Sequence, residues 1–150
     1  MSNKLINLNK LHKSKSFKIG GVRLLNDLVN EESWDEFKHW LLENASEIKK
    51  IKLVGIGGNI NKIFKLSGNK YGKPLSRSKF KSTLKKLKKT STKKMLLDLK
   101  LNPDRIDVIL PAGKIYYFLM KTLSIEKIYV PKIGLADGMV KKIINSKIKF

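Results

Sequence analysis

The residues best suited to chemistry are the glycines of segment 55–59, which reads GIGGN. The segment follows a β-branched run at residues 51–56 and precedes apolar residues at helical spacing, so we predict a strand-to-helix turn. Without side chains to block them, backbone amides in such a turn can approach an anion or a ribose. Ile60 stands where a dinucleotide fingerprint has its third glycine, and no Gly-Lys-Ser/Thr of a P-loop follows. The turn therefore indicates either an anion site or only a tight turn.

A lysine-rich segment at residues 79–89 is the second candidate. Phe80, Leu84 and Leu87 form an apolar stripe at helical spacing. A basic amphipathic helix of this kind binds polyanions or acidic membranes, or it packs on its own domain with its lysines in water. The lysines predicted to attract a polyanion are Lys81, Lys85, Lys88 and Lys89.

No other residues form a catalytic or metal-binding pattern. His12 and His39 have no serine or aspartate in a recognisable arrangement, and cysteine is absent. Asp104 and Asp107 flank Arg105, which suits a capped helix start with an ion pair better than a metal site. The six acids of the helix expected from residue 31 are scattered around it, which is typical of a solvated face. We therefore predict no catalytic residue and no metal ligand.

The chain of 150 residues carries a net charge of +21, yet only three of its basic residues are arginines. Arginine is the residue that grips phosphates with paired hydrogen bonds and reads guanine edges. Abundant lysine, isoleucine and asparagine all have A/T-rich codons, so biased genome composition explains the charge as well as a nucleic-acid partner does. No apolar run reaches the ~20 residues of a membrane span, and no signal-peptide core is present. These features predict a soluble cytoplasmic protein with no membrane partner.

The elements expected around the glycine turn alternate strands and helices. A hairpin at residues 4–18 precedes a short helix at 22–29 and a helix that Asn30 caps and that ends near residues 49–50. A helical excursion at about 75–100 follows the turn. A largely buried helix is expected over residues 106–123, with its regular part beginning near Leu110 because Pro111 is tolerated only in the first turns. A parallel strand at 126–130 and a helix at 135–144 close the chain.

We predict a single α/β domain, 1–150, with a mixed sheet and helices on both faces. Ligands of such sheets bind beyond the strands' carboxyl ends, here at residues 55–59 and 131–137.

Three segments together resemble the exopolyphosphatase/guanosine pentaphosphate phosphatase (Ppx/GppA) family. They are residues 16–24 (SFKIGGVRL), residues 54–59 (VGIGGN), and a third segment that runs from 101–112 (LNPDRIDVILPA) through 128–138 (IYVPKIGLADG). The resemblance implies an actin-like fold of two ribonuclease-H-like lobes, of which this chain matches the second. The family's Asp-x-Gly-Gly-Gly-Ser-x-Glu motif, on the strand that opens this lobe, is missing. Relatives also tend to have Glu-Arg where this chain has Lys93 and Lys94.

By this resemblance, Gly55, Gly57, Gly58 and Asn59 line the phosphate and nucleotide cleft. The intact enzyme would hydrolyse terminal phosphate of polyphosphate or guanosine pentaphosphate with Mg²⁺. The first lobe holds the catalytic acid, so this chain is expected to be a truncated or split form that is inactive alone. The alternatives are a non-catalytic polyanion-binding module for polyphosphate or RNA, and a non-functional remnant.

The missing strand has a structural consequence. It would lie between the hairpin and the parallel strands, where unpaired backbone groups cost about 1–3 kcal/mol each. Three outcomes are expected: the hairpin shifts to pair with the strand at residues 51–56, another chain such as the first lobe or a second copy supplies a strand, or the fold is marginal.

Overall fold

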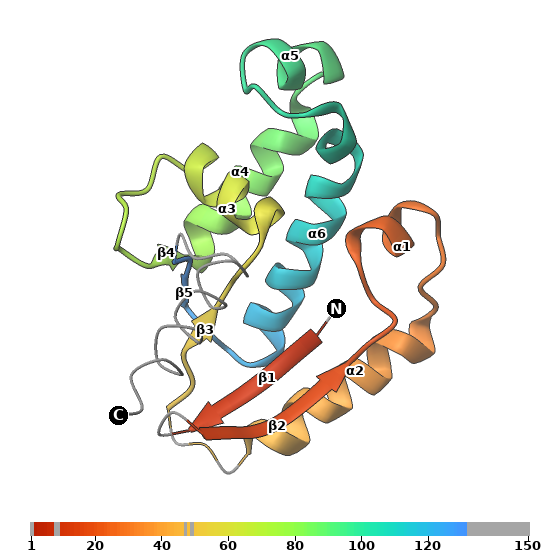
Figure 1. The fold of residues 1–150 in the computed structure, drawn as a ribbon, viewed down its shortest axis with the longest axis vertical. Helices are drawn as coiled ribbons and strands as arrows, with labels where there is room; N and C mark the ends of the chain where they lie inside the picture. The colour runs from red at the N-terminus through yellow and green to blue at the C-terminus, as the bar shows by residue number, and fades with distance from the viewer. Residues whose placement is uncertain (1, 8–9, 47, 49, 132–150) are drawn as a thin grey trace, which may run out of the picture.

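The computed structural model describes residues 2–7, 10–46, 48 and 50–131, and of residues 2–7 and 10–12 only the backbone. Figure 1 shows a long central helix with the hairpin, α1 and α2 on one side of it and α3 and α4 on the other. The strands are β1 (Ser2–Asn7), β2 (Lys10–Ser16), β3 (Leu53–Val54), β4 (Leu75–Ser76) and β5 (Lys127–Tyr129). The helices are α1 (Gly21–Leu25), α2 (Glu31–Ala45), α3 (Gly58–Leu66), α4 (Arg77–Lys89), α5 (Thr92–Leu97) and α6 (Pro103–Thr122).

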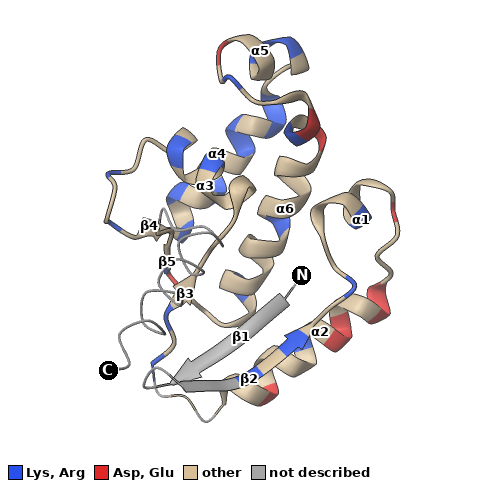
Figure 2. Ribbon diagram, in the orientation of Figure 1, with Lys and Arg blue, Asp and Glu red and all other residues tan. Residues whose placement is uncertain are grey.

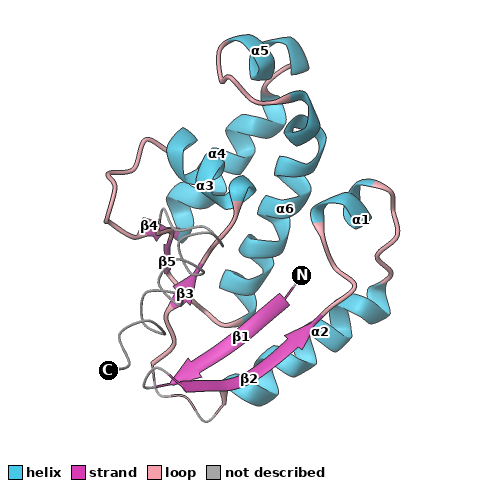
Figure 3. Cartoon of the chain, viewed as in Figure 1, coloured by secondary structure: helices cyan, strands magenta, loops and turns pink. Residues whose placement is uncertain are grey.

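The strands form two separate sheets, as the strand colouring of Figure 3 makes visible. β1 and β2 form the expected antiparallel hairpin. The second sheet has the order β3-β5-β4, with β5 parallel to β3 and antiparallel to β4. The predicted mixed α/β class is confirmed. The expectation that the hairpin shifts to pair with β3 is wrong for the described residues, in which β3 pairs only with β5.

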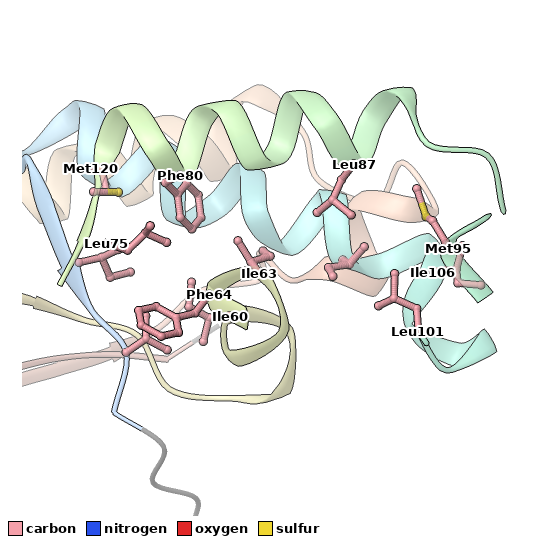
Figure 4. Close-up of a cluster of buried hydrophobic side chains, with 13 residues drawn as sticks. Ile60, Ile63, Phe64, Leu75, Phe80, Leu87, Met95, Leu101, Ile106 and Met120 are labelled. Atoms are coloured by element: carbon pink, nitrogen blue, oxygen red, sulfur yellow. The ribbon is translucent and has the colours of Figure 1, made fainter. Parts of the chain in front are cut away.

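Two hydrophobic clusters share α6. The larger joins α3, α4, α5 and the second sheet, and Figure 4 shows Phe80 and Leu87 pointing from α4 into it. The smaller joins the residues that follow β2 to α2 through Phe17, Phe37 and Leu41, with α6 contributing Ile115 and Leu119. Helix α6 therefore holds the two sheets together, although no hydrogen-bonded ladder connects them in the part of the chain that the structure describes.

Several helix starts follow the sequence signals. Asn30 caps α2 through its side-chain oxygen, which accepts a hydrogen bond of 3.0 Å from the amide of Ser33, and the acids Glu31 and Glu32 occupy the first turn. Ser76 caps α4 and Ser91 caps α5 in the same way. In each case a side-chain oxygen accepts a hydrogen bond from a backbone amide that has no partner within the helix.

The largest correction concerns α6, which is regular from Pro103, whereas the sequence predicted a helix over 106–123 that becomes regular only near Leu110. Pro111 lies inside this helix of 20 residues. Because proline removes one internal hydrogen bond at an energetic cost, packing must stabilise the helix through that position. Ile109, Ala112 and Ile115 are all buried around it. Tertiary packing on both sides of α6 thus outweighs the local penalty.

Other boundaries also differ from expectation. Helix α2 ends at Ala45 instead of near residues 49–50, α1 covers only Gly21–Leu25, and β3 is two residues long. The two-residue strand β4, which pairs with β5, was not predicted from the sequence. The predicted helix 135–144 and most of the turn 131–137 lie outside the described residues.

Candidate functional site

The glycine turn lies where it was predicted, between β3 and α3. Gly57 is the N-cap of α3 and has a φ of +124° and a ψ of 166°, a conformation open essentially to glycine alone. A Cβ on Gly55 would lie 2.8 Å from Ile60 and 3.0 Å from Ile128, so close packing of β3, α3 and β5 needs a glycine there. The turn is therefore a necessary structural element as well as a candidate site.

The turn presents backbone amides at the start of a helix of nine residues. The first internal hydrogen bond of α3 runs from the amide of Asn61 to the carbonyl of Gly57, at 3.1 Å. The amides of Gly58, Asn59 and Ile60 precede it and have no partner within the helix. A helix start of this kind carries partial positive charge and donors that suit an anion.

Arg105 lies directly against the turn. A Cβ on Gly58 would be 2.5 Å from its Nη1 and 2.8 Å from its Cζ, so the missing side chain of Gly58 makes room for the guanidinium. Arg105 lies in the first turn of α6, where the sequence predicted an ion pair with Asp104 or Asp107. That ion pair is absent from the described residues, and Asn102, at the N-cap position, makes no side-chain capping bond. The guanidinium is thus left to face the turn and the adjoining cavity.

A cavity of about 610 Å³ adjoins Gly58 and Arg105. This volume falls within the roughly 300–1,000 Å³ of small-molecule sites. Its polar lining comes from Asn61, Lys62, Lys65, Asn69, Tyr71 and Arg105. The Oδ1 atom of Asn61 is buried without a hydrogen-bond partner among the described residues. The lining therefore combines three cationic groups with an unsatisfied amide oxygen.

The electrostatics of this cavity favour an anion. The pKa of Lys62 is lowered, first by partial burial and then by repulsion from Lys65 and Arg105. Its Nζ donates hydrogen bonds to the carbonyls of Leu99 at 2.7 Å and Lys100 at 3.0 Å, which hold the ammonium at the cavity wall. An anion placed among these groups would relieve their mutual repulsion.

A smaller cavity of about 190 Å³ also adjoins the turn. It is lined by Gly20 and Gly21, by residues 56–60 and, from α6, by Ala112, Ile115 and Tyr116. The Tyr116 hydroxyl donates a hydrogen bond of 3.2 Å to the carbonyl of Ile56. Burial raises the pKa of Tyr116 more than this hydrogen bond lowers it, so the hydroxyl stays a donor at neutral pH.

The structure separates the two groups of residues singled out from the sequence. Gly57, Gly58 and Asn59 line the smaller cavity, and Gly58 also lines the larger one, whereas Gly55 packs beneath the turn. Lys81, Lys85, Lys88 and Lys89 are exposed on α4 and line neither cavity. Figure 2 shows basic residues along α3 and α4, while acids gather on α2. The apolar stripe of α4 packs on its own domain, with Phe80 and Leu87 buried. This is the second of the two alternatives that the sequence left open for this helix.

Sequence reasoning missed the functional potential of Arg105, Lys62 and Asn61. Lys62 and Asn61 follow the turn on α3, so their proximity was readable from the sequence. Arg105 comes from a helix that begins far along the chain, and only the fold brings it to Gly58. His39 is exposed, and no cluster of three or more potential metal ligands occurs in the described part of the chain.

The fold is that of one part of the Ppx/GppA structures. The chain superposes on the crystal structure of the Aquifex aeolicus member of the Ppx/GppA family with a TM-score of 0.75 and 21% identity, covering 99% of this chain and 54% of that one. An exopolyphosphatase from Cytophaga hutchinsonii gives a TM-score of 0.76 at 18% identity, covering 97% of this chain and 54% of that one. The chain thus spans about half the length of both. The similarity bears out the fold predicted from the resemblance.

No protein-family model matches the sequence, and comparison with curated proteins gives no match. Within the described residues, no helix is long and apolar enough to cross a membrane.

Proposed function

We propose that this chain is one part of an exopolyphosphatase-type phosphohydrolase and contributes to phosphate binding at the glycine turn. The observation that carries the proposal is the placement of the Arg105 guanidinium against Gly58, at a helix start whose amides have no internal partner. Polyphosphate and guanosine polyphosphate have the charge and the repeated oxygens that such a group binds. The similarity to exopolyphosphatase structures supports this substrate class.

In this proposal the chain binds and orients phosphate and does not carry out hydrolysis alone. The groups around the turn are backbone amides, Arg105 and Lys62, and the described residues that line the two cavities include no carboxylate or histidine to act as the general base. The catalytic acid and both phosphate loops of the family would come from residues outside 1–150. We expect the purified chain to release no phosphate from polyphosphate.

The same residues do not fit a resident magnesium ion. Mg²⁺ takes oxygen ligands, mostly carboxylates and phosphates, whereas the ionisable side chains lining the larger cavity are two lysines, an arginine and a tyrosine. Within the proposal, Mg²⁺ would be bound through the substrate phosphates and the other part of the enzyme.

The test compares two arginine variants that change the net charge equally. Arg105→Met should weaken binding of a defined polyphosphate at least tenfold, measured by isothermal titration calorimetry at about 0.15 M salt, because it removes a charge-assisted contact. Arg23→Met removes an exposed charge on α1 and should leave binding within twofold. Equal binding by both variants would refute a site at the turn.

A second candidate is a polyanion-binding module on α4, favoured by the exposure of its four lysines. In that case, a variant with glutamine in place of Lys81, Lys85, Lys88 and Lys89 would lose binding. The separate Arg105→Met variant would bind with nearly the affinity of the unaltered chain. Such a surface would also lose affinity steeply with salt, for RNA as for polyphosphate.

A further inference from the structure

The side chain of Lys62 is held in one place by the backbone of a distant loop. It reaches from α3 to the loop before α6, where its Nζ donates hydrogen bonds to the carbonyls of Leu99 at 2.7 Å and Lys100 at 3.0 Å. No third hydrogen bond joins Nζ to a described residue. An ammonium has three N–H donors, and the neutral amine has two donors and a lone pair. The two carbonyls therefore satisfy both donors of the amine and leave its lone pair free.

This amine borders the cavity of about 610 Å³, and its surroundings favour the neutral form. Partial burial, and then the charges of Lys65 and Arg105, lower the pKa of Lys62. Burial and neighbouring cations are the two conditions that turn a lysine amine into a nucleophile. Lys62 is therefore a fixed and activated amine on the wall of an accessible cavity.

The same neighbours select the electrophile that such an amine would meet. Lys65 and Arg105 line the cavity beside Lys62, and cations of this kind bind phosphoryl oxygens. They also stabilise the negative charge that develops when a phosphate leaves. An acyl phosphate combines a phosphoryl group with a reactive carbonyl carbon and releases phosphate. A thioester has no charge at its leaving group for these cations to stabilise.

We propose that Lys62 is a site of acylation by small acyl phosphates, and that this modification weakens phosphate binding at the glycine turn. The proposal rests on the proposed function, because the groups that would bind polyphosphate would also hold the phosphoryl group of the acyl donor. A bound donor keeps its carbonyl carbon close to Nζ, which makes the transfer effectively intramolecular.

The reaction needs only the amine and the acyl phosphate. The lone pair of Nζ forms a bond to the carbonyl carbon, and the bond from that carbon to the phosphate oxygen breaks. The bonding electrons leave with the phosphate, which also takes up the proton that the amine loses. The products are an amide at Lys62 and inorganic phosphate, with no change of oxidation state.

Acylation would change the cavity in two ways. It removes the positive charge of Lys62, so the cavity attracts phosphate less strongly. The amide nitrogen keeps one N–H, so either Leu99 or Lys100 loses the hydrogen bond to its carbonyl. The modification would thus lower the affinity for polyphosphate and loosen the contact between α3 and the loop before α6.

The test treats the full chain with acetyl phosphate at neutral pH and follows each lysine by mass spectrometry of peptides cut at acidic residues. Lys62 should be acetylated about tenfold faster than Lys81, an exposed lysine of α4, because the bound phosphoryl group raises the local concentration of the acyl carbon. Acetic anhydride has no phosphoryl group, so it should favour Lys62 over Lys81 by less than about threefold. Added polyphosphate should protect Lys62 from acetyl phosphate and leave the rate at Lys81 unchanged.

Two arginine variants show whether the phosphoryl group directs the reaction. Arg105→Met should slow acetylation of Lys62 by acetyl phosphate about tenfold and leave its reaction with acetic anhydride within about threefold, because only the first reagent needs the guanidinium. Arg23→Met removes an exposed charge on α1 and should change neither rate. If Arg105→Met lowers the melting temperature, the comparison of the two reagents on the unaltered chain decides.

A third pair of proteins measures the effect on binding. Lys62→Gln removes the charge as acetylation does, and it should bind polyphosphate about fivefold more weakly by isothermal titration calorimetry. Lys81→Gln makes the same change on the exposed face of α4 and should bind within about twofold of the unaltered chain.

Three results would overturn the proposal. The first is acetylation of Lys62 by acetyl phosphate no faster than that of Lys81. The second is an equal preference for Lys62 with acetic anhydride, which would show a reactive amine without a bound phosphoryl group. The third is equal polyphosphate binding by Lys62→Gln and Lys81→Gln. If one of these occurs while Arg105→Met still weakens polyphosphate binding, the acylation proposal fails and the proposed function stands. If Arg105→Met affects neither polyphosphate binding nor acetylation, both fail.

Discussion

At the scale of single residues, the two adjacent glycines of the turn have different roles. Gly57 adopts a backbone conformation that side chains disfavour, while Gly58 leaves the space that Arg105 occupies. The sequence indicated that glycines were needed here, and it could not distinguish these two reasons. The distinction depends on a backbone angle and on a contact between residues far apart in the chain.

The conformation of Gly57 leads to a prediction about stability. Gly57→Ala should lower the free energy of unfolding by about 1–3 kcal/mol, because a Cβ is strained at a φ of +124°. Gly20→Ala is the matched control, since Gly20 is extended at a φ of −162° and has open space around its Cβ. Urea denaturation measures both variants. Equal changes in the free energy of unfolding of the two variants would show that the turn accommodates a side chain at position 57 without strain.

At the scale of elements, signals within a few residues of sequence were reliable. The hairpin, the Asn30 cap of α2 and the parallel strand β5 are all confirmed, because each depends on local hydrogen bonding and side-chain alternation. The predictions that were wrong depend on distant residues. Pro111 is tolerated because α6 is packed on several sides, and β3 is short because only β5 is available for pairing among the described residues.

The packing around α6 predicts that Pro111 is a local weak point. Pro111→Ala should raise the free energy of unfolding by about 1–3 kcal/mol, because alanine restores an internal hydrogen bond and relieves the clash with the preceding turn. Pro103→Ala makes the same substitution at the start of α6, where proline is favoured, and should be neutral or destabilising. Thermal or urea unfolding of the two variants gives the comparison. A loss of stability in Pro111→Ala would mean that the packing of α6 requires the proline geometry.

At the scale of the whole molecule, the sequence identified the fold through a resemblance that the structural comparisons bear out. The structures from Aquifex aeolicus and Cytophaga hutchinsonii each match nearly all of this chain with about half of their own length. What the sequence could not settle was how the hairpin and the parallel strands are arranged where the resemblance implies a further strand between them. In the described residues the hairpin and the second sheet are not joined by strand pairing. Two of the three expected outcomes therefore remain as predictions: another chain supplies a strand, or the fold is marginally stable.

The charge of the molecule yields a prediction about salt. Against a net charge of +21, the described residues contain two ion pairs, Lys15 with Glu36 and Arg77 with Glu126. Most lysines therefore repel one another without compensation, and added salt should stabilise the fold by screening that repulsion. Between about 0.05 and 0.5 M sodium chloride we expect the melting temperature to rise by several degrees, since 1 kcal/mol corresponds to about 2–4 °C at this chain length. The variant with glutamine at positions 81, 85, 88 and 89 has four fewer charges on α4, so its melting temperature should start higher and rise less. A melting temperature that falls with salt would show that attractive pairs outweigh the repulsion.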